Sequence, residues 1–360
     1  MNLVVAYFNE LFRTARDGWN RFWFTPSDVA TLALIRIGAG AMLFYTHFVW
    51  GLGFGDFLSP EGLLPRATFD AFYGANASYA FTHLWMLKSP TAIWTAHVAA
   101  LAVFAMFAAG LFTRVTSILA CLLTLSYIHR LPLALFGTDQ LNAMLALYLA
   151  LAPSGDAYSL DRWRAARKLR EHGAGGPLPD AAASTSANIA VRLIQLHMCA
   201  IYFFAGIGKL QGDSWWAGYA LWGAAANMEY RTVDLTWLAH VPVIMALLTQ
   251  LTAYWELFFC VLIWPRLLRP LMIVVALALH LSIGICMGLM TFGLIMPIAV
   301  YSFVPPEWTR RFVQRRSEAA TASGAGEGSE KSTPSKSTPQ SGLAPSASTG
   351  RRSGPRSGKR

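Results

Sequence analysis

The sequence predicts an all-α protein: a polytopic integral membrane bundle of about eight transmembrane helices, followed by a disordered basic C-terminal tail. Of the 360 residues, 55% are hydrophobic and only 13% are charged, whereas soluble domains carry roughly 25% charged residues. The hydrophobic residues also gather in eight segments that reach or approach the ~20 residues needed to cross the hydrocarbon core. This composition excludes a typical soluble enzyme.

The chain divides into three predicted regions. Residues 1–24 mix apolar and basic side chains at helical spacing, which is typical of an amphipathic helix lying in the membrane interface. Residues 25–306 hold the transmembrane domain, and residues 307–360 are rich in Ser, Gly and Pro, which predicts disorder. The eight predicted spans are 28–50, 91–112, 115–131, 138–153, 187–210, 241–264, 268–288 and 290–305, of which the third, fourth and eighth are short.

Basic residues set the predicted orientation, because Lys and Arg favour the cytoplasmic side of a span. The arginines of the first 24 residues, the five basic residues of the 154–186 connection and the two of the 265–269 turn all fall on one side under an eight-helix count. Both termini are therefore predicted to be cytoplasmic, in a multi-pass protein that we expect in a bacterial inner membrane. The tail carries +7 of the net charge of +10, and beside a membrane its nearest partners are anionic lipids rather than nucleic acid.

Several ionisable residues fall inside the predicted spans, where charge is costly and indicates function by default. Arg36 and Glu256 both lie 8 residues from the cytoplasmic ends of their spans, about 12 Å by helical rise. Equal heights predict a structural ion pair between them. His197 and His280 come out a few ångströms higher by the same rise, so these four groups are expected to share one layer near the midplane.

Lys209 differs, because it ends the fifth predicted span at the outer interface. Gly206 and Gly208 precede it, and Asp213 and Trp215 follow it in a connection rich in aromatic residues. A lysine at an interface usually snorkels to water. A partly desolvated amine can instead act as a general base, and the residue types leave both readings open. The outer connections 51–90 and 211–240 are predicted to form an aromatic layer at the membrane surface.

The segment YFFAGIGKLQGDSWWAGYAL resembles the part of vitamin K-dependent gamma-carboxylases that reads aromatic-x-x-A-G-x-x-K-L, then an acidic residue and Trp, then Gly-Tyr. LALHLSIGICMGLMTFGLIM, which contains His280, is similar to the active-site histidine segment of that family. LALIRIGAGAMLFY, with Arg36, and PSGDAYSLDRW resemble the wider HTTM (horizontally transferred transmembrane) family. The resemblance implies that Lys209 is a base acting on a reduced quinone and that His280 belongs to the same site.

Two functional hypotheses follow. The first is an HTTM-family protein with an outward-opening pocket for a quinone-like or other lipid-soluble small molecule. Lys209 and His280 would be catalytic, Asp139 or Asp213 would pair with the lysine, and Trp215 and Tyr219 would contact the substrate. The second is a non-enzymatic membrane scaffold that binds a lipid or a partner.

Other motifs are missing from the sequence. The chain has no phosphate-binding glycine loop, no H-E-x-x-H metal motif and no nucleophile elbow, so no metal site or nucleotide chemistry is predicted. The four cysteines lie in apolar runs and are predicted to be free thiols. The five remaining membrane-end histidines lack ligand spacing and are interpreted as separate interfacial residues: His47, His83, His97, His129 and His240.

Overall fold

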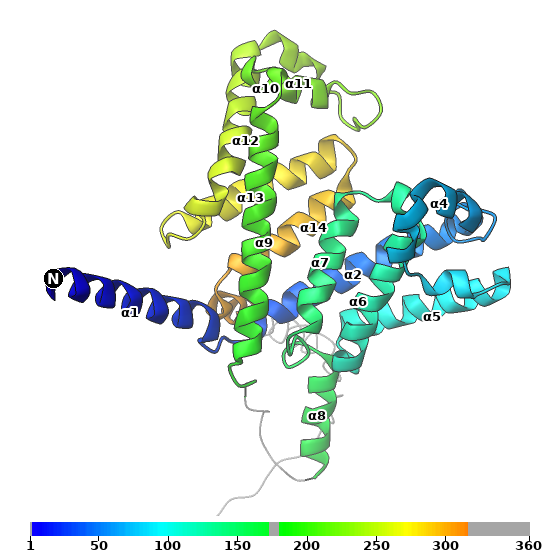
Figure 1. Ribbon diagram of the computed structural model, residues 1–360, viewed down its shortest axis with the longest axis horizontal. Coiled ribbons are helices and arrows are strands. Elements are labelled where there is room, and N and C mark those ends of the chain that lie inside the picture. The colour runs from blue at the N-terminus through cyan, green and yellow to red at the C-terminus, as the bar shows by residue number, and fades with distance from the viewer. Residues whose placement is uncertain (1, 173–179, 316–360) are drawn as a thin grey trace, which may run out of the picture. The chain divides into compact units, whose positions relative to one another are not determined.

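The computed structural model describes residues 2–172 and 180–315, and within these ranges the chain is helical (Figure 1). No β-strand occurs in the described residues; Ser27 and Ser184 form an isolated antiparallel bridge. The predicted all-α class is therefore confirmed. The chain divides into two compact units, residues 1–311 and 312–360, and the first is described below. In the second, residues 312–315 are helical.

Each of the eight predicted spans coincides with a helix whose ends lie within a few residues of the prediction. These helices are α2 (Ala30–Leu52), α5 (Pro90–Ala109), α6 (Thr113–Arg130), α7 (Gly137–Ala150), α9 (Thr185–Leu210), α12 (Pro242–Leu262), α13 (Arg269–Cys286) and α14 (Met290–Val300). Short signals fix several ends. The Ser89 and Ser184 side chains accept hydrogen bonds from the first turns of α5 and α9, as good N-caps do.

Other helices precede, join or follow these elements. They are α1 (Asn2–Phe24), α3 (Phe54–Phe57), α4 (Arg66–Tyr73), α8 (Leu160–Glu171), α10 (Asp213–Trp216) and α11 (Ala220–Ala225), together with the 3-10 turns Gly74–Tyr79, His83–Met86, Pro132–Ala134, Thr236–His240 and Tyr301–Phe303. The predicted amphipathic segment 1–24 is thus helical almost throughout. Its last turn meets α9, where the Asn188 amide donates to the carbonyls of Phe22 and Trp23.

Five helices, α2, α5, α9, α12 and α13, are long and apolar enough to cross a membrane. At most half of each apolar stretch is buried within the protein, so many Leu, Val and Ile side chains face outward, as in a bundle surrounded by lipid. Helices α7 and α14 have 14 and 11 residues, about 21 and 17 Å by helical rise, against a hydrocarbon core of about 30 Å. The fold is that of a multi-pass membrane protein, and the count of eight crossings stays a prediction.

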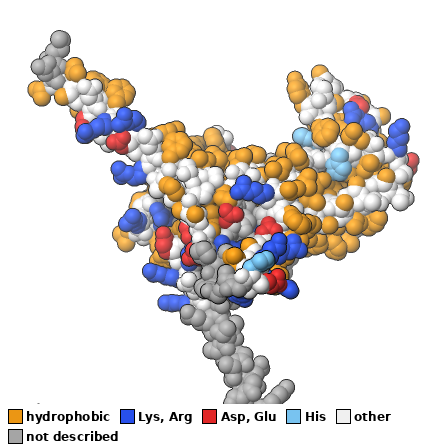
Figure 2. All heavy atoms as spheres, turned by 90° about the horizontal axis from the view of Figure 1, so that it is seen from below, with side chains coloured by type: hydrophobic (Ala, Val, Ile, Leu, Met, Phe, Trp, Pro, Cys, Tyr) orange, Lys and Arg blue, Asp and Glu red, His pale blue; other side chains and the backbone are white. Residues whose placement is uncertain are grey.

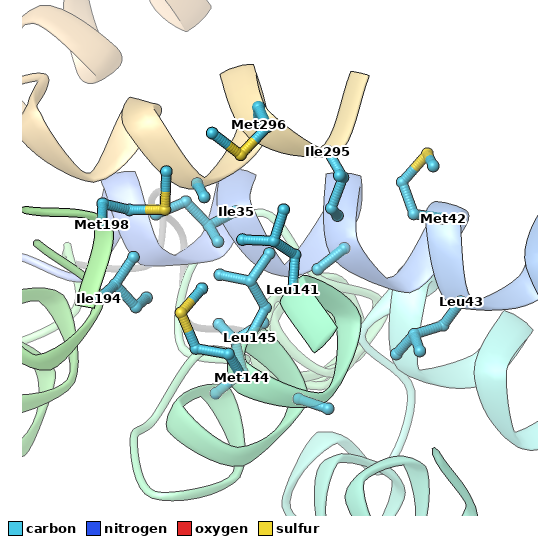
Figure 3. Close-up of a cluster of buried hydrophobic side chains, with 14 of the residues drawn as sticks. Ile35, Met42, Leu43, Leu141, Met144, Leu145, Ile194, Met198, Ile295 and Met296 are labelled. Atoms are coloured by element: carbon cyan, nitrogen blue, oxygen red, sulfur yellow. The ribbon is translucent and has the colours of Figure 1, made fainter. Parts of the chain in front are cut away.

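The core lies where α2, α7, α9 and α14 meet (Figure 3). Branched and thioether side chains interdigitate there: Ile35, Met42 and Leu43 from α2, Leu141, Met144 and Leu145 from α7, Ile194 and Met198 from α9, and Ile295 and Met296 from α14. All four cysteines are free thiols, as predicted, and Cys121 and Cys199 are buried. The core thus joins helices from both halves of the chain.

The two ends of α9 differ in character. Helices α10 and α11 lie at the end where α9 stops, and α8 lies toward the end where it begins (Figure 1). Helix α8 carries five basic residues, and Figure 2, seen from the α8 side, shows Lys and Arg side chains gathered over part of this face. The basic connection and the aromatic connection are therefore at opposite ends of α9.

The predicted tail begins too early at residue 307. Residues 306–315 are helical, and the buried Thr309 hydroxyl lies 3.2 Å from that of Thr31. Arg310 bonds to Asp28 and to Asp180, each at 2.6 Å. These contacts hold the start of the predicted tail in the fold, so its boundary is corrected to at least residue 311. The rest of the tail prediction, from residue 316, lies outside the described residues.

Candidate functional site

Lys209 and Glu256 form an ion pair between the last turn of α9 and the middle of α12. Glu256 has 8% of its side chain exposed and Lys209 has 22%, so the carboxylate is buried and the amine reaches the edge of the protein. The predicted pairing of Glu256 with Arg36 is wrong, and so is the predicted pairing of Lys209 with Asp139 or Asp213. Two residues that the sequence assigned to different partners belong to one site.

Gly206 explains how the pair forms. A Cβ atom at this position would lie 2.6 Å from the backbone nitrogen of Leu257, so α9 and α12 touch backbone to backbone there. Lys209 follows Gly206 by one turn on α9, and Glu256 directly precedes Leu257 on α12. The close approach therefore brings the two side chains together. Gly208, the other glycine before Lys209, faces open space.

The comparison of heights failed for a geometric reason. It assumed that the spans are parallel and that they start at one level. Figure 1 shows α2 and α5 running in a different direction from α9, and α12 is displaced toward the end of α9: Leu257, in the C-terminal half of α12, contacts Gly206, about one turn before α9 ends. Counting residues from each predicted cytoplasmic end therefore placed Glu256 far below Lys209, although the two side chains form an ion pair.

Tyr202 and His280 form a second polar pair beside the first. The Tyr202 hydroxyl lies 2.7 Å from His280 Nε2, and the two side chains, from α9 and α13, are 1% and 2% exposed. The Tyr202 ring packs against Trp255 and Phe259 of α12 at centroid distances of 5.2 and 4.2 Å. His280 thus lies in the expected region. Tyr202 was not singled out, although its spacing of seven residues before Lys209 places both on one face of α9.

The aromatic connection covers the end of this site. Helix α10 folds back over α9, because Trp216 Nε1 donates to the Leu210 carbonyl at 2.6 Å and Gln250 of α12 donates to the Trp215 carbonyl at 2.7 Å. The Trp215 ring lies 5.3 Å from Lys209 Nζ, within range of a cation–π contact. Of the two residues predicted to contact the substrate, Trp215 therefore lies beside Lys209.

Asp213 and Tyr219 are exposed residues of the connection beyond the site. Asp213 begins α10, and Tyr219 precedes α11 with 53% of its surface exposed. The structure gives neither residue a side-chain contact with Lys209, whose carboxylate partner is Glu256. Their predicted roles toward a substrate remain predictions.

Arg36 serves a different part of the fold. Its fully buried guanidinium donates through Nη2 to the Tyr158 carbonyl at 2.6 Å. A Cβ at Gly110 would lie 1.9 Å from Nη1, so only glycine fits beside it, and its φ of +71° also favours glycine. Tyr158 itself has a φ of +46°, a strained value for a non-glycine residue. Arg36 therefore fastens the connection after α7 to α2.

Asp161 completes this connection outside the spans. Its carboxylate accepts from the backbone nitrogens of Phe112 and Thr113 at 2.8 and 2.7 Å and from the Thr113 hydroxyl at 2.8 Å. It thereby caps the start of α6. Burial raises the pKa of Asp161, but the hydrogen bonds from Thr113 and Phe112 outweigh burial, and the net pKa lies below its ordinary value.

The other two polar residues singled out in the sequence, His197 and Asp139, also have partners other than Lys209. His197 lies on an exposed face of α9, where its Nδ1 is 3.1 Å from the Tyr148 hydroxyl. Asp139 accepts from the Phe136 backbone nitrogen at 2.9 Å and caps its own helix, α7. The predicted layer of four polar groups is wrong: Glu256 and His280 belong to the lysine site, while Arg36 and His197 do not.

Four histidines that the sequence left separate gather around the end of α6. His97 Nδ1 lies 2.7 Å from the Tyr127 hydroxyl, and the His47 ring packs on the Tyr127 ring at 4.6 Å. His83 Nδ1 lies 2.6 Å from the Ser126 hydroxyl. The fourth, His129, bonds to the backbone of Phe81. His47 and His97 are 5% and 0% exposed, so both are buried inside the protein, and their position at the membrane interface stays a prediction.

Comparisons with known proteins match nothing: no family model, no curated protein and no solved structure is similar to this chain. Within the described residues, no three His, Cys, Asp or Glu side chains come together as metal ligands would. The site must therefore be interpreted from its own groups. These are an ion pair with one partly exposed end, an aromatic cover, and a buried tyrosine–histidine pair.

Proposed function

We propose that this protein binds a lipid-soluble ring compound with an acidic hydroxyl, a reduced quinone, at the Lys209 end of the bundle and accepts a proton from it. The observation that carries the proposal is the Lys209–Glu256 pair, whose amine reaches the protein edge while its carboxylate is buried. Ionisable groups within spans indicate function by default. The resemblance to the HTTM and gamma-carboxylase lysine segment points to the same residue.

The Lys209–Glu256 pair can supply an uncharged amine as a base, and forming that amine does not change the net charge of the pair. Lys209 and Glu256 are neutral as a unit, whether both are ionised or the proton has passed from the amine to the carboxylate. In the second arrangement the free amine can take the hydroxyl proton of the ligand, which leaves a quinolate beside a charged lysine and a protonated Glu256. A ligand ring would lie against Trp215, whose indole is already beside the amine.

The second candidate function is a non-enzymatic scaffold. It is supported by the large exposed aromatic side chains around the same end of α9, Trp216, Tyr219 and Trp237, which are more than half exposed. Such residues anchor a protein at the membrane surface or contact a partner. In a scaffold the ion pair would only hold α9 to α12.

One substitution separates the two functions. Lys209→Arg keeps the positive charge, but a guanidinium does not lose its proton. The protein, purified into lipid nanodiscs without oxygen, is mixed with reduced menaquinone, and the absorbance of the quinolate is recorded at constant pH. The proposal expects quinolate with the unmodified protein and none with Lys209→Arg or Lys209→Ala, while all three proteins stay folded.

Two results contradict the base. Quinolate formed at the normal level by Lys209→Arg leaves the lysine as a charged anchor. Absence of binding and of quinolate in the unmodified protein favours the scaffold. Lys88→Arg is the matched control, because it makes the same substitution at an exposed lysine outside the site.

A further inference from the structure

A small cavity lies in the other half of the bundle, away from the Lys209 site. It is bounded by α2, α6 and the start of α7, and its polar lining comes from Thr46, His47, Thr124, Asp139 and Asn142, with the Trp50 and Tyr127 rings beside them. Its free space is about that of one water molecule. Ile128 and Leu135 complete the lining, so polar side chains share the cavity with apolar and aromatic ones.

His47 presents a hydrogen-bond acceptor to this cavity. Its Nδ1 lies 2.7 Å from the Leu43 carbonyl, and a carbonyl only accepts, so Nδ1 carries the proton. The ring packs between Phe104 and Tyr127 at 4.3 and 4.6 Å, where an imidazolium would be costly. In the neutral ring, the remaining nitrogen, Nε2, has a free lone pair.

Asn142 presents a second acceptor. Its amide nitrogen is 3.4 Å from the Thr46 hydroxyl, and its Oδ1 is buried without a partner. Asn142 is 1% exposed, and a buried polar atom without a partner costs about 1–3 kcal/mol. The side chain also lines the cavity, so a donor placed there would remove that cost.

We propose that this cavity binds one water molecule, which donates one hydrogen to His47 Nε2 and the other to Asn142 Oδ1. Both groups accept, so the occupant must donate twice, and the space admits nothing larger than water. The water links α2 to α7 at a point where the direct contact, Asn142 to Thr46, is long. It is a second polar site, independent of the proposed quinone site.

The sign of one stability change tests the water. Asn142→Leu replaces the amide by an apolar side chain of nearly the same size. If water bridges the two acceptors, the substitution strands the water and lowers the melting temperature by a few degrees. If the cavity is empty, the same substitution removes an unpaired buried oxygen and raises the melting temperature. A rise would overturn the proposal.

Two controls isolate the effect. Thr46→Val removes the long contact from Asn142, and the change in melting temperature that it causes is subtracted from that of Asn142→Leu. Thr124→Val changes a lining residue whose hydroxyl already donates to Ala120 at 2.7 Å, so it measures any general effect of altering the lining. In a His47→Phe background, Asn142→Leu should cost much less than alone, because the water has already lost one partner.

A direct observation keeps the proposal testable if a variant fails to fold. A high-resolution density map of the unmodified protein should show a single peak within hydrogen-bonding distance of both His47 Nε2 and Asn142 Oδ1. An empty cavity in that map would refute the bound water, and so would density for a larger molecule.

Discussion

Breaking the Lys209–Glu256 pair should destabilise the protein by an amount that depends on which partner remains. Removing one member of a buried pair costs about 3–5 kcal/mol, because the other charge is left uncompensated. Lys209→Met strands Glu256, which has 8% of its side chain exposed, so the full cost of about 3 kcal/mol or more is expected. Glu256→Gln strands Lys209, whose 22% exposure lets water reduce the cost to about 2 kcal/mol.

The double variant Lys209→Met with Glu256→Gln should be milder than Lys209→Met alone, since no charge is stranded. The expected coupling between the two substitutions is about 2 kcal/mol, or roughly 30-fold in the unfolding constant. Reversible unfolding in mixed detergent and lipid, followed by tryptophan fluorescence, measures each free energy. The chain has 13 tryptophans, so the signal is ample.

Arg36 supplies the contrast. Arg36→Met loses the hydrogen bond to the Tyr158 carbonyl and is expected to be destabilising, but its effect should add to that of Glu256→Gln within about 0.5 kcal/mol. Additive effects of Lys209→Met and Glu256→Gln, or coupling of Arg36 with Glu256, would show that the ion pair has been assigned wrongly.

Three further predictions concern packing, pH and orientation. Gly206→Val should cost about 1–3 kcal/mol by overpacking and should also abolish the coupling of the pair, because Leu257 has no room to give; unfolding titrations check both. Asp161 has a folded pKa below its unfolded value, so its stabilisation is present above pH ~4 and disappears as the pH falls through the folded pKa; Asp161→Asn should therefore destabilise at pH 7 and lose its effect in acid, whereas a constant effect would contradict the cap. A reporter enzyme active only in the cytoplasm should be active when fused after Arg170 and inactive when fused near Gln211; the reverse pattern would invert the topology.

The helices were predictable from the sequence because their signals are local. Apolar runs of sufficient length, a serine cap before α5 and α9, and Gly110 in a left-handed conformation after α5 mark positions that need no knowledge of the neighbouring helices. For the same reason the class of protein and the approximate ends of its helices were predicted. Which side chains meet could not be predicted, because contact depends on how far each helix is displaced and tilted relative to the next.

Lys209 and Glu256 show what a sequence can and cannot indicate. Both were recognised as exceptional, because charge inside an apolar run is visible. Their partnership was missed, because it depends on where α12 touches α9. The glycine at 206 was the available signal: a small residue one turn before the lysine, on the face shared with Tyr202, marks a close helix crossing. The carboxylate partner of Lys209 is therefore the acid beside the residue of α12 that contacts this glycine, and not an acid at the same predicted height.

The histidines around Tyr127 gave no such signal. His47, His83, His97 and His129 come from α2, a 3-10 turn, α5 and α6, at spacings that match no motif. Packing of these elements brings them together; at Gly51, a Cβ would lie 2.5 Å from His97 Nε2. A cluster that depends on several long-range contacts is visible only once the helices are placed.

The two polar regions differ in what stability alone requires of them. The His47 and Asn142 side chains are interpreted as neutral and need only hydrogen bonds, which a water molecule can complete. The Lys209–Glu256 pair is charged, and replacing a buried ion pair by apolar side chains of similar size is often neutral or stabilising. Holding α9 to α12 therefore does not require these charges, since Gly206 and the rings of Tyr202, Trp255 and Phe259 already pack the two helices together. A charged pair with its amine at the protein edge is what the proposed exchange of a proton with a ligand requires, and this is why we propose that function rather than adhesion between helices.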